Sequence, residues 1–160
     1  MKIDNISNIS IKNSRIRLKS YLYCRHFNMN STVRIILLII MHAIGDFFLQ
    51  GSKLSSIKAL KMNALLEHVG IYTLLFIILS PLALGLTFVQ GLEFSVITGI
   101  FHFGIDYFTG KYKQRYINES ESKYIEVVGI DNTLHILILV GSYIYLFPDA
   151  LNHYSPLLKY

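Results

Sequence analysis

Four long apolar runs constrain the fold of this chain more than any other feature of its sequence. They cover residues 33–49, 64–86, 92–108 and 127–147, and Pro81 interrupts the second run. A helix that crosses the hydrocarbon core of a bilayer needs about 20 mostly apolar residues, within a range of roughly 17–25. Each run is long enough, although the first and third only just reach this length. We therefore expect four transmembrane helices.

The composition agrees with a membrane protein. Hydrophobic residues make up 52% of the 160 residues and charged residues only 16%, whereas an ordinary soluble domain is less apolar and more charged. Only short polar connections separate the runs, so the expected fold is all-α, an antiparallel bundle of about four helices in one domain. This domain would cover residues 32–148. Residues 1–31 would form a basic, partly disordered or interfacial tail, and residues 149–160 a C-terminal tail.

The net charge of +5 does not indicate nucleic-acid binding, because the basic residues lie where lipid headgroups would meet them. Seven precede or begin the first run, and seven occupy the loops after the first and third runs. These two sets face opposite sides of a four-span bundle, so the positive-inside rule gives no orientation unless the first run is re-entrant or the tail is misassigned. The single cysteine, Cys24, allows no disulfide within the chain and no cysteine-based metal site.

The end of the first run carries three polar side chains that a purely apolar helix would not need: His42, Asp46 and Gln50. Their spacing of i, i+4 and i+8 projects them from one face of a regular helix. A His/Asp pair four residues apart recurs twice more, as His102 and Asp106 in the third run and in reverse order as Asp131 and His135 in the fourth.

An up-down-up-down bundle would bring these pairs to one side of the membrane. They lie near the C-terminal ends of the first and third runs and near the N-terminal end of the fourth, and a further histidine begins the second. Ionisable groups inside a membrane are costly unless they face the bundle interior and find a partner there. We therefore expect one buried polar layer near one membrane surface. Its members would be His42, Asp46, His68, His102, Asp106, Asp131 and His135.

Four imidazoles and three carboxylates are suitable ligands for a divalent transition metal such as zinc, manganese or iron. One or two ions fit this set, with open positions for a bound water that the ion activates as a nucleophile. Asp46 or Asp106 could serve as the general base. Gln50 and Asn132 are expected to orient ligands or substrate. An anionic headgroup or phosphate would be attracted by the nearby lysines Lys53, Lys58 and Lys61.

The leading hypothesis is a membrane metal-dependent hydrolase that acts on a lipid-linked or phosphate-containing substrate. A small metal-ion or proton transporter is an alternative, but it needs a polar path to the opposite surface, and residues 73–79 and 136–140 offer little. Haem ligation fits less well, because an aspartate lies one turn from three of the histidines. An assembly protein would use the same residues only to fix helix packing, and Asp131 could then be a helix N-cap.

The spaced polar motifs resemble one known family. The run His42-x-x-x-Asp46-Phe-x-Leu-Gln50, the histidine at the start of the second helix, the His102-x-x-x-Asp106-Tyr segment and Asp131-x-x-x-His135 are similar to the bacterial membrane proteins of domain of unknown function 3307. The resemblance covers residues 35–147. Asn132 stands where that family commonly has glutamine. The resemblance implies a bacterial or phage-encoded protein of the cell membrane with several spans, and it supplies no activity.

Overall fold

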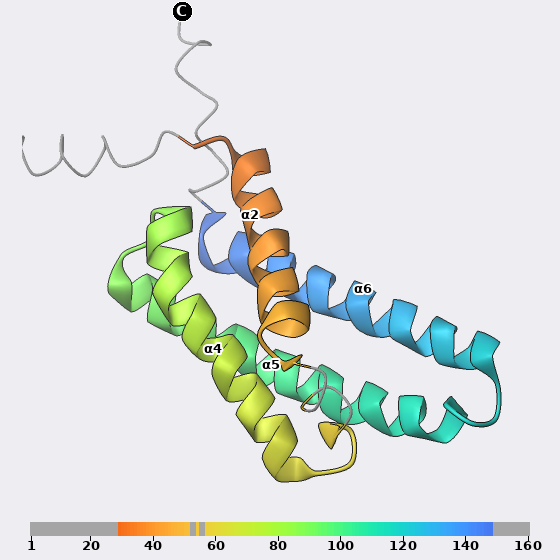
Figure 1. The fold of residues 1–160 in the computed structure, drawn as a ribbon. Helices are drawn as coiled ribbons and strands as arrows, with labels where there is room; N and C mark the ends of the chain where they lie inside the picture. The colour runs from red at the N-terminus through yellow and green to blue at the C-terminus, as the bar shows by residue number, and fades with distance from the viewer. Residues whose placement is uncertain (1–28, 52–53, 55–56, 149–160) are drawn as a thin grey trace, which may run out of the picture.

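The computed structural model describes residues 29–148 apart from 52–53 and 55–56. It contains α2 (Ser31–Ala43), which continues into the π-helical turn η1 (Ile44–Phe48), and then α4 (Met62–Leu84), α5 (Phe88–Tyr116) and α6 (Glu121–Leu146). Successive long helices run antiparallel (Figure 1). The all-α, four-helix fold is therefore confirmed. The predicted tails lie almost entirely outside the described residues, so the domain boundaries stay predictions.

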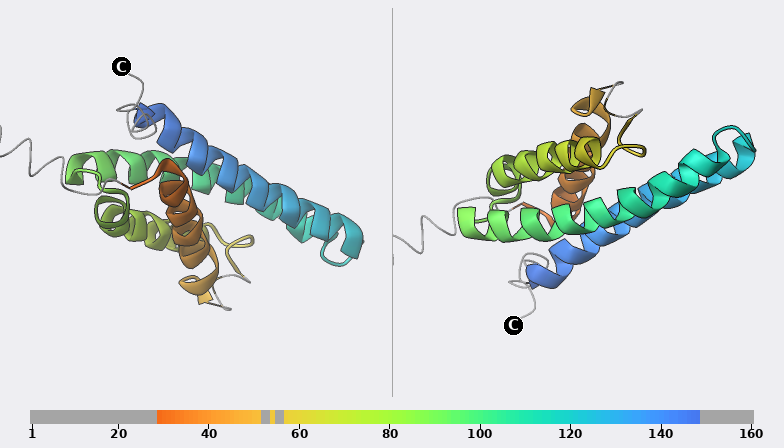
Figure 2. Two further views of the ribbon diagram at one scale, coloured as in Figure 1. Left: turned by 90° about the horizontal axis from the view of Figure 1, so that it is seen from above. Right: turned by 90° about the horizontal axis from the view of Figure 1, so that it is seen from below.

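All four helical segments are long and apolar enough to cross a membrane, which indicates a multi-pass membrane protein. The first span, Ser31–Phe48, is one continuous helical segment rather than a re-entrant hairpin. The 29 residues of α5 make it about 43 Å long, which exceeds a hydrocarbon core of about 30 Å. Figure 2 shows α5 and α6 side by side, with their connected ends extending past α2 and α4.

The last two helices are longer than the apolar runs predicted. The third was expected near residues 92–108 and the fourth near residues 127–147, but α5 ends at Tyr116 and α6 begins at Glu121. Lysine, arginine and glutamate at these ends are good helix formers even though they are not apolar. Ser120 caps α6 by accepting a hydrogen bond from the backbone N–H of Lys123. Asp131 consequently lies inside α6, and the prediction that it caps the helix is wrong.

The remaining helix ends, those of α2 and α4 and the start of α5, have specific caps. Asn30 is the N-cap of α2, because its side chain accepts from the N–H of Thr32 at 3.0 Å. The helix α4 continues through Pro81 and ends at Gly85, whose φ of +69° is in the left-handed region that glycine tolerates. A capping box between Thr87 and Gln90 then begins α5. The connection between α4 and α5 is therefore a tight turn.

Two glycines let neighbouring helices approach closely. A Cβ atom on Gly91 of α5 would lie 2.7 Å from Pro81 Cγ on α4, and one on Gly45 of η1 would lie 2.8 Å from Tyr72 Cδ2 on α4. Small residues at helix contacts allow such close packing within membranes. Since Gly45 adjoins Asp46, this contact fixes how the end of α2 and η1 sits against α4.

An apolar core occupies the part of the bundle where α2 begins and α6 ends. Arg34 is buried there and donates a hydrogen bond to Tyr143 Oη at 3.3 Å. The core is rich in aromatic rings and reaches the polar layer through Met41 and Tyr72. Its buried members are Leu38, Met41, Tyr72, Phe76, Leu84, Phe94, Leu139, Tyr143 and Phe147.

Substitution of Gly45 by alanine is expected to destabilise the fold by about 1–3 kcal/mol, because the added methyl group meets the buried Tyr72 ring. Gly104→Ala is the matched control, since a Cβ atom there meets nothing within 4 Å. That change should be neutral or stabilise by about 0.5–1 kcal/mol. Thermal unfolding in detergent, monitored by circular dichroism, measures the stability of both variants. Equal unfolding midpoints for the two variants would contradict the packing argument.

Candidate metal site

The structure brings the seven predicted side chains into one buried cluster. They come from the end of α2 and η1, the second turn of α4 and the middle of α5 and α6, and each is only 0–4% exposed. Their ligand atoms form three overlapping groups, within each of which all atoms lie within 4.8 Å of one another. These groups are Asp46, His68, His102 and Asp106; His42, Asp46 and His135; and Asp106, Asp131 and His135.

The first group, which we call the four-donor group, has the spacing of a metal site. His68 Nε2 lies 3.1 Å from Asp46 Oδ1 and 3.2 Å from Asp106 Oδ2. His102 Nε2 lies 3.7 Å and 3.4 Å from the same two oxygens and 2.9 Å from His68 Nε2. Four ligands bound tetrahedrally at about 2.0–2.1 Å would be about 3.3 Å apart. The group could therefore hold a metal ion with little rearrangement.

The four converging atoms have few N–H groups among them that could donate hydrogen bonds. A carboxylate only accepts hydrogen bonds, and a neutral imidazole carries a single N–H. The two Nε2 atoms of His68 and His102 are 2.9 Å apart, so two lone pairs would repel unless a proton or a cation lies near them. Uncompensated polar atoms are costly in a buried layer. A cation placed among the four atoms would satisfy them together.

Lys58 supplies one cation to this group. Its Nζ donates to Asp46 Oδ1 at 3.3 Å and to Asp106 Oδ2 at 3.0 Å, and it lies 3.1 Å from His68 Nε2. Lys58 was expected from the sequence to attract a phosphate, and its contacts with the ligands themselves were not predicted. Nothing in the local pattern distinguishes Lys58 from the neighbouring lysines. Only the tertiary structure identifies it as the lysine that reaches the carboxylates.

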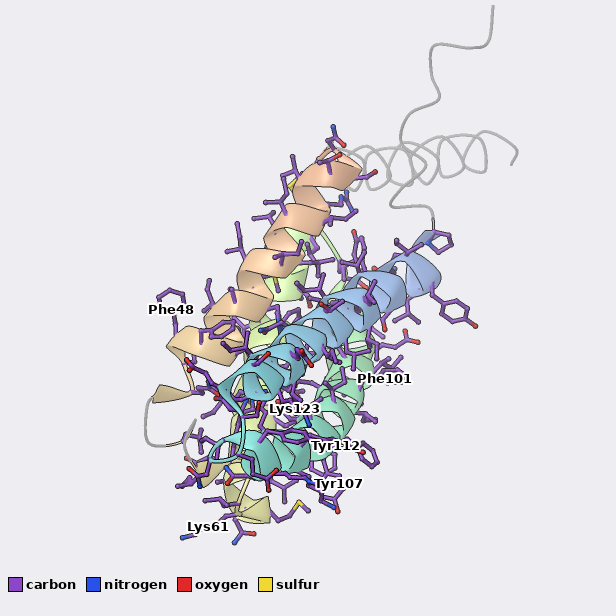
Figure 3. All side chains as sticks on the ribbon, turned by 90° about the vertical axis from the view of Figure 1, so that its right-hand side faces the viewer. Phe48, Lys61, Phe101, Tyr107, Tyr112 and Lys123 are labelled. Atoms are coloured by element: carbon purple, nitrogen blue, oxygen red, sulfur yellow. The ribbon has the colours of Figure 1, made fainter. Side chains whose placement is uncertain are left out.

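A cavity of about 210 Å³ opens beside the four-donor group. Asp106 lies in its wall, and Lys111 donates to Tyr107 Oη at 2.7 Å there. Figure 3 shows Lys61 and Tyr107 toward the same end of the molecule. Three lysines make the cavity cationic, so an anion can approach the carboxylate layer from this side. The lining comprises Lys58, Ala59, Leu60, Lys61, Met62, Leu65, Asp106, Tyr107 and Lys111.

Asp131 has partners of its own. Thr109 Oγ1 donates to Asp131 Oδ1, and Lys113 Nζ donates to Asp131 Oδ2 at 2.6 Å. Both carboxylate oxygens are thus engaged at the outer side of the cluster. The sequence analysis assigned no role to Thr109 or Lys113. Lys113 was expected in a loop, but the extension of α5 places it one turn beyond Thr109, facing α6.

Tyr72, like Lys58, belongs to the cluster but was not predicted from the sequence. Its ring stacks on His102 with 3.9 Å between the centroids, and its hydroxyl lies 3.3 Å from His42 Nδ1. The available signal was its position four residues after His68, which puts both on one face of α4. Tyr72 thus contacts two imidazoles of the cluster, that of His102 through its ring and that of His42 through its hydroxyl.

Three residues were expected to support the site. Gln50 follows η1, where the N–H of Leu49 bonds to Ile44 O at 3.0 Å, so the regular i+8 spacing from His42 is lost. Its Oε1 is buried without a partner in the described part of the chain. Asn132 donates to Val128 O within its own helix at 3.1 Å rather than to the cluster. Lys53 lies outside the described residues. The roles assigned to these residues stay predictions.

Comparison with known proteins identifies one family. The family described as "Protein of unknown function (DUF3307)" matches residues 34–158, which include all seven clustered side chains. The resemblance inferred from the spaced polar motifs is therefore confirmed. No curated protein and no solved structure matches the chain.

Substitution of Lys113 by methionine is expected to destabilise the fold by about 1.5–3 kcal/mol, because it leaves the buried Asp131 carboxylate without its charged donor. Lys111→Met is the control on the same helix, since Lys111 bonds only to the Tyr107 hydroxyl in an exposed setting. Chemical or thermal unfolding in detergent compares the two variants. An equal loss of stability in both would contradict the proposed pairing of Lys113 with Asp131.

Proposed function

The chain belongs to the DUF3307 family, and we propose that this member binds a divalent transition metal through the four-donor group and uses it for hydrolysis. Zinc, manganese or iron suits a set of two imidazoles and two carboxylates. The observation that carries this proposal is the convergence of four buried donor atoms. The two imidazole nitrogens lie 2.9 Å apart and 3.1–3.7 Å from the two carboxylate oxygens, close to the separations in a tetrahedral site. The proposed location is the bacterial inner membrane.

A metal ion held this way would activate a water molecule. Four protein ligands leave room for a further ligand on an ion that can expand its coordination, and the ion makes bound water acidic enough to yield hydroxide near neutral pH. Asp46 and Asp106 each contribute one oxygen to the four-donor group. The second oxygen of either carboxylate could accept the proton of the water, so both are general-base candidates.

The surroundings of the site favour an anionic substrate. Lys58, Lys61 and Lys111 line the cavity beside the four-donor group, and Asp106 connects that cavity to the proposed ligands. Lysine binds phosphate as a point charge without demanding one geometry. We therefore propose a phosphate-containing, lipid-linked substrate that reaches the site from the membrane surface, with membrane lipid and not nucleic acid as the partner.

The apolar core argues against a transporter. Between the cluster and the opposite end of the bundle, the interior holds aromatic and aliphatic side chains such as Phe76, Phe94 and Leu139. The hydroxyl groups of Ser95 and Thr98 are buried there, but they donate to backbone carbonyls of their own helix. The described residues thus offer no continuous polar path across the bundle.

Metal analysis of the protein purified in detergent tests the proposal. The wild type should retain at least one transition metal ion per chain, whereas a His102→Ala/Asp106→Asn variant should lose it. Glu93→Gln is the matched control, because Glu93 is an exposed carboxylate on the same helix. Absence of transition metal from a folded wild type would overturn the proposal and favour an assembly protein whose polar layer only fixes helix packing.

Lys58 is expected to oppose metal binding. Its ammonium and a divalent ion would share the Asp46 and Asp106 oxygens, so the lysine must turn away when the ion binds. Lys58→Met should therefore raise metal affinity by about 10- to 150-fold, as expected from loss of hydrogen bonds to charged groups worth about 1.5–3 kcal/mol. Isothermal titration calorimetry measures this change, with Lys61→Met as the exposed control. Weaker binding by Lys58→Met would show that Lys58 supports the metal instead.

A further inference from the structure

We infer that a second metal ion binds beside the first, held by His42, His135 and Asp46, with the Asp46 carboxylate bridging the two ions. This inference rests on the proposed function and specifies the kind of centre that performs it. The three residues form one of the groups whose ligand atoms lie within 4.8 Å of one another. Each of the three residues is at most 4% exposed.

His135 is oriented to present a free lone pair. Its Nδ1 lies 2.9 Å from the backbone carbonyl oxygen of Asp131, and a carbonyl only accepts, so Nδ1 carries the proton. In the neutral ring Nε2 is then an unprotonated acceptor. This atom is buried and has no hydrogen-bond partner among the described residues. A hydrogen bond on one ring nitrogen that leaves the other free is the usual arrangement of a histidine metal ligand.

His42 can take the same arrangement on the opposite side of the group when its Nδ1–H donates to the Tyr72 hydroxyl, which leaves Nε2 unprotonated. Its Nδ1 lies 3.3 Å from Tyr72 Oη, and a hydroxyl can accept this hydrogen bond. The Nε2 atom of His42 is also buried without a partner in the described part of the chain. The rings of His42 and His135 stack with 5.3 Å between their centroids and 25° between their planes. The two rings thus adjoin one another in the interior, and each has one ring nitrogen without a hydrogen-bond partner in the described residues.

Asp46 connects this region to the four-donor group. Its Oδ1 lies 3.1 Å from His68 Nε2, whereas its Oδ2 lies 4.0 Å from His42 Nε2. The two oxygens of one carboxylate thus face two different sets of imidazoles. A carboxylate that binds two ions through separate oxygens places them in the same small site. The arrangement also leaves Asp106 as the better general-base candidate, because Asp46 would have no free oxygen.

The group of Asp106, Asp131 and His135 is a weaker candidate for the second ion. Both oxygens of Asp131 already accept hydrogen bonds, from Thr109 and Lys113. In contrast, the two imidazole nitrogens of the inferred site have no partner in the described residues. Asp131 instead supports the site through its backbone carbonyl, which fixes the orientation of His135.

The second site is looser than the first. The separation of 4.0 Å between His42 Nε2 and Asp46 Oδ2 exceeds the 2.9–3.7 Å found in the four-donor group. Water would complete the coordination of an ion with only three protein ligands. We therefore expect the second ion to bind more weakly and exchange faster. Two ions about 3.5–4 Å apart are the arrangement with which many hydrolases stabilise both the attacking and the leaving oxygen of a phosphate ester.

Electron paramagnetic resonance with Mn²⁺ as the probe tests this inference on the full chain in detergent. Titration of chelator-treated protein counts bound ions through loss of the six-line signal of free Mn²⁺. The wild type should bind about two ions in two steps, and the doubly loaded protein should give a spin-coupled spectrum. His42→Gln and His135→Gln should each bind one ion with an uncoupled spectrum. Thr133→Ala, which removes an exposed hydroxyl that donates to Gly129 O within α6, should behave as the wild type.

The outcomes separate the second site from the first. One bound ion and no spin coupling in the wild type would overturn the second site and leave the proposed function standing. Two ions that persist in both histidine variants would overturn the assignment of His42 and His135. Absence of bound ion from the folded wild type would overturn the proposed function as well. Circular dichroism of each variant establishes that a lost ion does not reflect a lost fold.

Discussion

Two carboxylates buried between apolar helices are the constraint on which the rest of this structure depends. A buried charge that loses its partner costs about 3–5 kcal/mol, so Asp46 and Asp106 need partners within the bundle. His68 from α4, His102 from α5 and Lys58 from the connection before α4 all approach the same pair of oxygens. The helices must therefore meet at this layer. Gly45 gives the end of α2 and η1 the room to reach it.

The bundle is divided into two parts with different chemistry. One part is filled by aromatic and aliphatic side chains, and the other holds the polar cluster with a lysine-lined cavity beside it. This division suits a reaction at a membrane surface, because a headgroup can reach the polar part while acyl chains remain in the bilayer. The connected ends of the long α5 and α6 extend past α2 and α4 (Figures 1 and 2), and Lys113 near the end of α5 forms an ion pair with Asp131.

The sequence predicted the bundle and the gathering of the seven side chains, because antiparallel packing places neighbouring helix ends together. It did not predict the helix ends of α5 and α6, since their charged residues form helix without contributing to an apolar run. The regular spacing from His42 to Gln50 assumes 3.6 residues per turn, and the π-helical turn η1 interrupts that period. Lys58 was not recognised as a cluster residue, because its contacts cross between segments and leave no local pattern. Tyr72 was not recognised either, although it lies four residues after His68 on the same face of α4.

X-ray absorption spectroscopy of the metal bound to the purified protein tests the central claim most directly. The account predicts a first shell of nitrogen and oxygen atoms at about 2.0–2.1 Å for zinc, with the outer-shell scattering of imidazole rings. That imidazole scattering should decrease in a His102→Ala variant. A shell of oxygen atoms alone, or a spectrum that His102→Ala leaves unchanged, would contradict the claim that the buried histidines and aspartates form the metal site.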